Sequence, residues 1–134
     1  MRVRSVPLVV GVLVCIALVA CSRASSSEPD GLFFPTVPRQ DAYPSALYSG
    51  KLVERSGCLM GGEHGPVFLW PDDYTARIGP DGRTQVLDED GAVVATASQD
   101  VSFGGGLVDA SFSPAAYQQT PSACGHRYWL VAPL

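Results

Sequence analysis

The chain has 134 residues, of which 46% are hydrophobic, enough for one small globular domain and too few for two. Its formal net charge is −4, with nine Lys and Arg against thirteen Asp and Glu. A protein that binds nucleic acid needs a clustered basic face, so this composition argues against a nucleic-acid partner.

The N-terminus has the pattern of an export signal rather than of a fold element. Arg2 and Arg4 precede an apolar run over residues 6–19, and the small residue Ala20 follows it. With Ala20 the run is about 15 residues long, whereas roughly 20 are needed to span a bilayer. We therefore expect a signal peptide at residues 1–20 and not a permanent transmembrane helix.

Residues 18–21, Leu-Val-Ala-Cys, resemble the lipobox of bacterial lipoproteins. In that family the cysteine sulfur takes a diacylglyceryl group, the preceding peptide is removed, and the cysteine becomes the new N-terminus. The resemblance implies lipidation of Cys21 and a place outside the cytoplasm. The protein would be anchored to the cell membrane, or to the outer membrane if its source has one. A plain secretory signal without lipid is the alternative.

The mature chain would be more acidic than the precursor. Loss of residues 1–20 removes two arginines and no acidic residue, so the formal net charge falls to −6. Such a chain has little electrostatic attraction to anionic lipid, and stable anchoring requires two or more acyl chains. We therefore expect the protein to be attached to the membrane by its N-terminal lipid.

A flexible tether is expected over residues 21–44, between the lipidated cysteine and the folded domain. Residues 22–30 are small and polar, and prolines follow at positions 35, 38 and 44. Segments of this kind bury too little apolar surface to offset their ordering entropy. Phe33 and Phe34 are an exception. They could enter the membrane interface or stay in water, but we expect them to dock on the domain.

Strand-forming runs punctuated by turns dominate residues 45–134, the predicted domain. The expected strands cover residues 46–54, 67–70, 74–78, 83–87, 92–97, 101–103 and 128–132. The turn sequences Gly-Pro-Asp-Gly at 79–82 and Asp-Glu-Asp-Gly at 88–91 separate three of them. Short strands at intervals of about 8 to 12 residues predict an all-β domain.

One short helix and one glycine run complete the predicted architecture. Ser113 can cap a helix, Pro114 suits its first position, and Pro121 ends it. The run at 104–106 lacks the lysine and helix start of a phosphate loop, so it indicates a bulge or bend where backbone approaches backbone. Five or six strands with one helix predict a small OB-like barrel, with a β-sandwich as the alternative.

A series of short motifs resembles a small secreted or lipid-anchored bacterial domain of unknown function. The motifs are Gly-Cys-Leu at 57–59, Trp-Pro at 70–71, residues 91–95, residues 101–105, and Cys124 with residues 128–131. The resemblance spans most of residues 46–134. It implies a compact β fold and carries no activity with it.

Two cysteines, Cys58 and Cys124, remain once the signal is removed and the lipidated cysteine is set aside. In an oxidising compartment an even pair predicts a disulfide. It would close a loop of about 67 residues and stabilise the fold by about 4 kcal/mol in the chain-entropy model. We expect Trp70 and Trp129 to pack against it.

A metal site is the alternative use of these cysteines. His64 lies six positions after Cys58, and His126 lies two positions after Cys124. These four residues have the composition of a tetrahedral zinc set, and Met60 would make the set suitable for Cu(I). Their spacing matches no common zinc motif, and a disulfide would consume both thiols. We therefore predict no metal or other cofactor, with a Cu or Zn lipoprotein as the alternative.

No catalytic motif is present. The sequence has no Gly-x-Ser-x-Gly elbow, and the predicted disulfide leaves no cysteine to act with a histidine as nucleophile. A hydrolase would need a pocket that holds two titratable groups within reach of each other. We predict a non-catalytic, membrane-anchored lipoprotein that binds a protein, glycan or small molecule. Its candidate ligand face comprises His64, Asp72, Asp73 and Tyr74, in two loops expected to be exposed.

Overall fold

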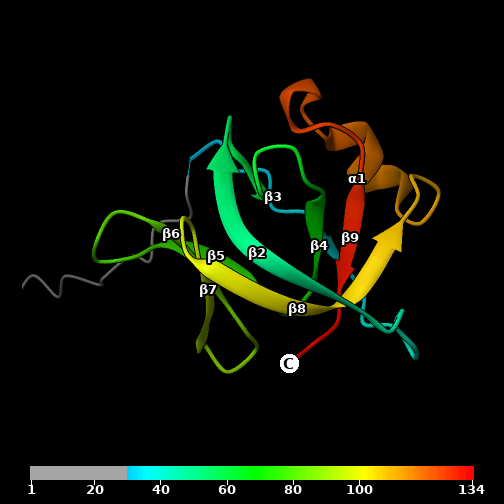
Figure 1. Ribbon diagram of the computed structural model, residues 1–134, viewed down its shortest axis with the longest axis horizontal. Helices are drawn as coiled ribbons and strands as arrows, with labels where there is room; N and C mark the ends of the chain where they lie inside the picture. The colour runs from blue at the N-terminus through cyan, green and yellow to red at the C-terminus, as the bar shows by residue number, and fades with distance from the viewer. Residues whose placement is uncertain (1–29) are drawn as a thin grey trace, which may run out of the picture.

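A computed structural model describes residues 30–134 (Figure 1), so the signal peptide, Cys21 and the first part of the tether lie outside the described residues. The described elements are β1 (Thr36–Val37), β2 (Ala46–Arg55), β3 (Cys58–Gly61), β4 (Val67–Pro71), β5 (Thr75–Ile78), β6 (Thr84–Leu87), β7 (Val93–Thr96), β8 (Asp100–Val108), α1 (Pro114–Gln119), the 3₁₀ helix η1 (Ser122–Cys124) and β9 (Tyr128–Val131). Between residues 30 and 134 there is no helix with the length and hydropathy of a membrane span.

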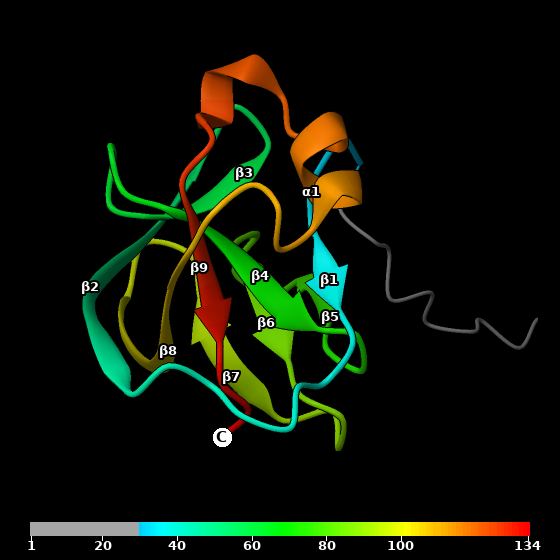
Figure 2. The same ribbon diagram turned by 90° about the vertical axis from the view of Figure 1, so that its right-hand side faces the viewer.

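Five strands close into a barrel in the order β2-β3-β4-β9-β8 and back to β2 (Figures 1 and 2). β4 and β9 run parallel, whereas the other neighbouring pairs are antiparallel. This is the connectivity of an OB-like barrel, which confirms the predicted fold class. Because β4 pairs with β9, the five barrel strands form a closed ring, whereas two sandwiched sheets would each have open edges.

The barrel closes because β2 and β8 each pair with two neighbouring strands, one after the other along their length. Residues 46–51 of β2 pair with β8, and residues 52–55 pair with β3. β8 passes from β2 to β9 at Gly105, which has a φ of 133°. A Cβ atom there would collide with the carbonyl oxygen of Leu130, so only glycine fits. The predicted close approach of backbone to backbone is therefore confirmed.

Alternation along the strands separates the buried apolar side chains into two clusters. The inner cluster draws on all five barrel strands, with Leu52, Leu59, Phe68, Trp70, Phe103, Trp129 and Val131. The outer cluster contains Cys58, Met60, Val67, Leu69, Tyr128 and Leu130 of the barrel, with Val37, Ala116 and Cys124 packed over them. The prediction that the two tryptophans pack on the cysteine pair was wrong. Trp70 follows Leu69 directly, so the pleat turns the two side chains to opposite faces.

A separate three-stranded sheet, β5-β6-β7, is inserted between β4 and β8. Its hairpins have the predicted turns, with Gly82 and Gly91 at φ values of 80° and 79°. The Asp88 carboxylate accepts from the backbone N–H groups of Asp90 and Ala92, both at 2.9 Å. Val86 and Ala95 of this sheet join the inner cluster, so the insertion covers part of the barrel core.

The predicted helix is present with the predicted cap. Ser113 precedes α1, and its hydroxyl accepts from the backbone N–H of Ala116 at 3.3 Å. Pro114 occupies the start of the helix. α1 and η1 lie between β8 and β9, and they cover the outer cluster through Ala116 and Cys124.

The N-terminal segment packs along the barrel, which corrects the predicted tether. The backbone N–H of Phe33 donates to the carbonyl oxygen of Gly57 at 2.7 Å, and Trp70 N–H donates to Pro35 at 3.0 Å. β1 then runs parallel to β4, with Val37 buried. The packed chain therefore begins well before residue 45. Proline supplies an extended backbone as well as irregularity, and here the extended form is used to pair with a strand.

Two strands are absent from the prediction, and a third is much longer than predicted. β1 and β3 were missed because they are short, and β3 consists of Cys-Leu-Met-Gly, which has no β-branched residue. β8 continues through the glycine run to Val108. These elements exist because neighbouring strands pair with them, which local sequence does not encode.

Candidate functional site

The residues of the predicted ligand face lie at the two ends of β4. His64 is in the loop that precedes the strand, and Asp72 and Asp73 follow its last residue. β4 leads from the η1 end of the molecule toward the inserted sheet (Figure 2). Each end has its own pocket, so the structure offers two candidate sites rather than one.

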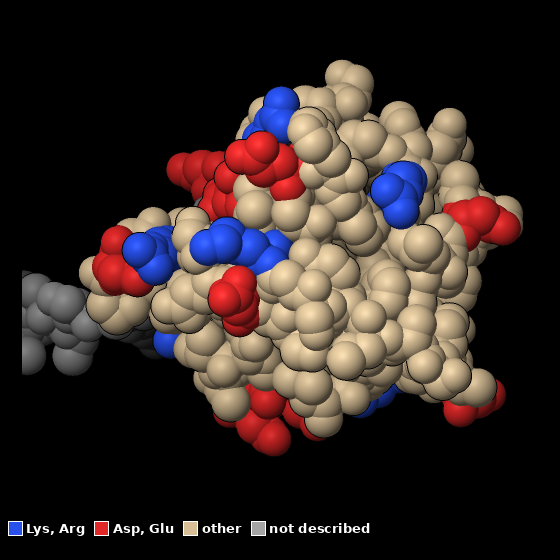
Figure 3. All heavy atoms as spheres, in the orientation of Figure 1, with Lys and Arg blue, Asp and Glu red and all other residues tan. Residues whose placement is uncertain are grey.

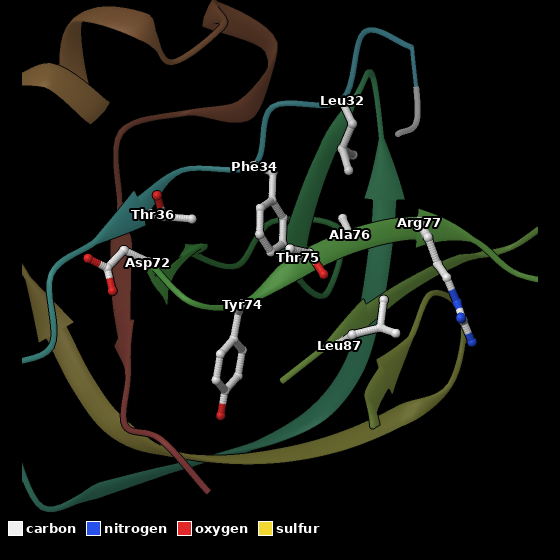
Figure 4. Close-up of a pocket in the computed structure, with 9 residues that line it drawn as sticks. All are labelled: Leu32, Phe34, Thr36, Asp72, Tyr74, Thr75, Ala76, Arg77 and Leu87. Atoms are coloured by element: carbon white, nitrogen blue, oxygen red, sulfur yellow. The ribbon is translucent and has the colours of Figure 1, made fainter. Parts of the chain in front are cut away.

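The larger pocket, which we call the aromatic groove, has a volume of about 620 Å³ and lies between the N-terminal segment and β5 (Figure 4). Its lining residues are Leu32, Phe34, Thr36, Asp72, Tyr74, Thr75, Ala76, Arg77 and Leu87. Most of these side chains are apolar, and the two charged ones come from the turn after β4 and from β5. A mostly apolar groove with a few polar groups is the usual form of a ligand site.

Trp70, which is fully buried, supports two rings of the groove. The Phe34 ring stacks on Trp70 with ring centroids 5.6 Å apart, and the Tyr74 ring stacks on it at 6.4 Å. The Tyr74 hydroxyl accepts from the backbone N–H of Leu134 at 3.3 Å. Three aromatic rings and the C-terminus therefore hold this part of the groove in place.

Tyr74 is only 4% exposed, so the expectation that it is an exposed ligand-face residue was wrong. Its ring joins the inner cluster because it follows Trp70 through a tight turn, in which Tyr74 N–H donates to Pro71 at 3.0 Å. The prediction that Phe33 and Phe34 dock on the domain is confirmed. Phe34 packs on the inner cluster and Phe33 on the outer one.

Asp72 and Arg77 give the groove opposite charges at its two ends (Figure 4). The Arg77 Nε donates to Gln85 Oε1 at 3.0 Å, which links the guanidinium to the neighbouring strand β6. Asp72 and Asp73 do not act as a carboxylate pair, because Asp73 accepts from Arg39 Nε at 2.7 Å. Asp72 is thus left at the groove.

Arg39 joins three segments beside the groove. It contacts Asp73 after β4 and Glu89 in the turn between β6 and β7, and it follows β1 in the chain. The hydrogen bond that Arg39 donates to the Asp73 carboxylate raises the pKa of the Arg39 guanidinium. The N-terminal wall of the groove is therefore attached to the barrel and to the inserted sheet at the surface as well as through Phe34.

β5 is an edge strand at the groove. Its order in the inserted sheet is β5-β6-β7, and within residues 30–134 it pairs with β6 alone. Three consecutive residues of the strand, 75–77, line the groove. An edge strand carries unpaired N–H and C=O groups that can receive another strand.

The second pocket, which we call the histidine pocket, lies at the start of β4 and has a volume of about 390 Å³. Its lining residues are Arg55, Met60, Glu63, His64, Gly65, Ser122, Ala123, Cys124, Gly125, His126 and Arg127. Both histidines of the chain are among them. Sequence reasoning had linked the two histidines through the cysteines, and it missed Arg55 and Arg127.

Cys58 and Cys124 lie at disulfide distance, with Cα atoms 5.9 Å apart. Both are buried, at 0% and 2% exposure. The pair links β3 to η1, so it holds together the two segments between which the histidine pocket opens. Among the described residues, no three His, Cys, Asp or Glu side chains gather as a metal site would need. The two thiols of the alternative metal set face each other instead.

Charge is sparse over the rest of the visible surface. On the face shown in Figure 3, most basic and acidic side chains gather on the side of the inserted sheet, and the remainder of the face is mainly uncharged. The two pockets are therefore distinguished by their local composition, one apolar with a charge at each end and the other polar with several basic side chains.

No protein-family model matches the chain, and no curated protein or solved structure is significantly similar to it.

Proposed function

We propose that this protein is a membrane-anchored extracytoplasmic lipoprotein whose β domain binds a ligand in the aromatic groove without catalysis. The lipobox-like residues 18–21 support the anchor. The groove supports the binding role, because it combines an apolar surface with two charged groups at separate positions. The second of these observations carries the proposal.

The ligand that fits the groove best is an extended peptide segment. β5 offers free backbone groups along the groove, and strand addition to such an edge supplies main-chain hydrogen bonds. Phe34 and Leu87 supply apolar contacts for alternate side chains of the peptide. Asp72 complements a basic group at one end of the peptide, and Arg77 complements an acidic group at the other.

A binding role suits the charged groups of the groove better than a catalytic one. Asp72 and Arg77 lie at opposite ends, where they can hold two charges of a ligand but cannot act together on one reacting atom. The Tyr74 hydroxyl is engaged with the C-terminus. These positions support recognition and leave the lining residues without an acid–base pair.

The alternative of a Cu or Zn lipoprotein draws less support. Cys58 and Cys124 lie at disulfide distance, so their thiolates would be lost as ligands. Arg55 and Arg127 line the same pocket as His64 and His126, and two permanent positive charges disfavour a cation there. Alkylation of the exported protein without reductant tests this alternative, since a metal–thiolate site requires two reactive thiols.

The anchor is tested by Cys21→Ser in the full chain. We expect the wild-type protein to take up radiolabelled palmitate and to sediment with membranes, and the variant to do neither. Ser25→Ala is a matched control, because it changes a nearby hydroxyl and should leave labelling unchanged. Continued membrane sedimentation of the Cys21→Ser protein without label would contradict a lipid anchor.

The groove is tested by peptide binding. The probes are acetylated hexapeptides with Phe and Leu at alternate positions, Lys at one end and Glu at the other, in both orders. We expect residue-resolved NMR shifts at Phe34 and along β5, and at least tenfold weaker binding by Asp72→Ala/Arg77→Ala, since a hydrogen bond to a charged group contributes about 1.5–3 kcal/mol. Asp81→Ala/Arg83→Ala removes an ion pair in the turn between β5 and β6, outside the groove lining, and should bind normally. If neutral glycans shifted these NMR signals and none of the peptides did, the peptide proposal would be wrong and the ligand would be a glycan.

A further inference from the structure

The histidine pocket gathers basic side chains on an otherwise acidic protein. We propose that it is a second ligand site, which binds the phosphate group of a phosphomonoester ligand. Arg55 and Arg127 are always cationic, and His64 and His126 add two ring donors, against the single carboxylate of Glu63. The precursor has a net charge of −4, so this local excess of basic groups runs against the composition of the chain.

The basic groups come from three segments that the fold brings together. Arg55 ends β2, His64 lies in the loop between β3 and β4, and His126 and Arg127 lie between η1 and β9. An anion placed among them would therefore meet donors from several directions. The site is absent from the sequence as a motif, because Arg55 and Arg127 are far apart in the chain.

Contacts within the pocket walls keep these segments in position. Arg55 Nη1 donates to the carbonyl oxygen of Glu63 at 3.4 Å, which spans the mouth of the loop. The Arg127 carbonyl accepts from Val67 N–H at 2.8 Å, at the first residue of β4. The cysteine pair links β3 to η1 beneath them. A binding site assembled in this way needs little reorganisation when a ligand enters.

His126 has a further support on α1. Its ring centroid lies 4.7 Å from that of Tyr117, with the ring planes 47° apart. Tyr117 is 44% exposed, so this contact lies at the surface beside the pocket. The helix therefore positions one of the two imidazoles through an aromatic contact.

A phosphate monoester matches these donors better than a carboxylate or a metal ion does. It carries a charge of about −1.5 to −2 at pH 7 and three strong acceptor oxygens. Guanidinium groups bind such oxygens through two parallel N–H donors, and two of them in one pocket repel a metal cation. The volume of about 390 Å³ leaves room for the group that carries the phosphate. Glu63 and Ser122 can bond to hydroxyls of that group.

This chemistry has two sources outside the cytoplasm, a soluble sugar phosphate and a phosphomonoester lipid headgroup. The experiment uses the full lipidated protein in phosphatidylcholine vesicles. Glucose 1-phosphate is titrated calorimetrically, with glucose and glucuronate as comparisons. A second series adds phosphatidic acid to the vesicles and records the NMR signals of His64 and His126.

We expect glucose 1-phosphate to bind, glucose not to bind, and glucuronate to bind at least tenfold more weakly. Arg55→Ala/Arg127→Ala should weaken glucose 1-phosphate binding at least tenfold, and Arg55→Lys/Arg127→Lys by less, because lysine keeps the charge and loses the paired donors. Lys51→Ala/Arg83→Ala removes two positive charges outside the pocket and should bind as the wild type does. The lysine variant keeps the test valid if the alanine variant fails to fold.

Histidine shifts that appear with phosphatidic acid and not with glucose 1-phosphate would assign the same site to a lipid headgroup. Absence of binding to every phosphate probe would overturn the proposal, and so would binding that both arginine variants retain. Asp72→Ala/Arg77→Ala in the aromatic groove should leave phosphate binding unchanged. The two proposed sites therefore succeed or fail separately.

Discussion

The two pockets lie at the two ends of β4, and the chain secures their walls by different means. The aromatic groove depends on an N-terminal segment attached by stacking of Phe34 on Trp70, by the two residues of β1 and by Arg39 at the surface. The histidine pocket lies between segments that the Cys58–Cys124 pair joins. The first wall is held to the barrel by noncovalent contacts alone, whereas the segments of the second are joined by a cysteine pair at disulfide distance.

This difference indicates how each site can respond to a ligand. The wall of the aromatic groove adds few main-chain bonds to the barrel, so local opening there costs less than unfolding of the domain. A groove that opens in this way can admit an extended chain along β5. The histidine pocket is better suited to a small group, because the cysteine pair joins the segments that carry its donors.

The largest expected effect comes from removal of the cysteine pair. Cys58→Ala/Cys124→Ala should lower the free energy of unfolding by about 4 kcal/mol, because the pair closes a loop with a sequence separation of 66. Below its melting temperature the variant should lose phosphate binding and keep peptide binding. Urea unfolding, together with both binding assays, checks this. An unchanged unfolding midpoint would show that Cys58 and Cys124 form no stabilising disulfide.

Gly105→Ala should weaken ligand binding at both sites equally, because it destabilises the barrel that carries both. The added Cβ collides with the Leu130 carbonyl, and alanine disfavours a φ of 133°. We therefore expect the free energy of unfolding to fall by about 3 kcal/mol. Gly104→Ala is the matched control, because its Cβ would meet Ala132 at an ordinary 3.7 Å. Urea unfolding of the two variants measures the difference. Equal stability of the two would contradict closure of the barrel at Gly105.

Phe34→Ala should affect the aromatic groove alone. The substitution removes the ring that stacks on Trp70. Because Phe34 is only partly buried, we expect the free energy of unfolding to fall by about 2 kcal/mol. Peptide binding should fall, whereas phosphate binding should persist. Hydrogen exchange at the Phe33 and Trp70 amides measures the loosening. Exchange that stays as slow as in the wild type would mean that the segment is held by other contacts.

The smallest effect is expected from Ser113→Ala at the start of α1. Loss of the cap to Ala116 should cost about 1 kcal/mol, and Ser113→Asp should restore it because aspartate caps equally well. Since α1 carries Tyr117, which contacts His126, phosphate binding should weaken slightly. Thermal unfolding and the phosphate titration check both expectations. If Ser113→Ala weakened peptide binding more than phosphate binding, the proposed support of His126 by α1 would be contradicted.

Local features of the chain were predictable because each rests on a few neighbouring residues. The turns that end in Gly82 and Gly91, the Ser113 cap and the Gly105 approach were all indicated by residue type and position. The candidate sites were harder to predict. His64 and His126 were linked through the cysteines, but Arg55 and Arg77 gave no signal, because a lone arginine in a strand is usually a solvated side chain.

The errors share one cause, which is that burial depends on distant partners. Tyr74 was expected to lie in an exposed loop, yet its ring packs in the core beside Trp70. The prolines before residue 45 suggested a tether, yet β1 lies along β4. Polarity and proline describe a segment in isolation, whereas a neighbouring apolar surface decides whether that segment packs.

By itself the sequence determined the all-β class, the hairpin turns and the capped helix, and it predicts the Cys58–Cys124 disulfide and the lipid anchor on Cys21, which lies outside the described residues. Backbone conformation at a turn or cap is decided within a few residues, which is why these features could be predicted. Only the tertiary structure decided that the N-terminal segment forms a wall, that one predicted ligand face divides into two pockets, and that two distant arginines join the two histidines. Those outcomes depend on barrel closure, in which strands far apart in the chain become neighbours.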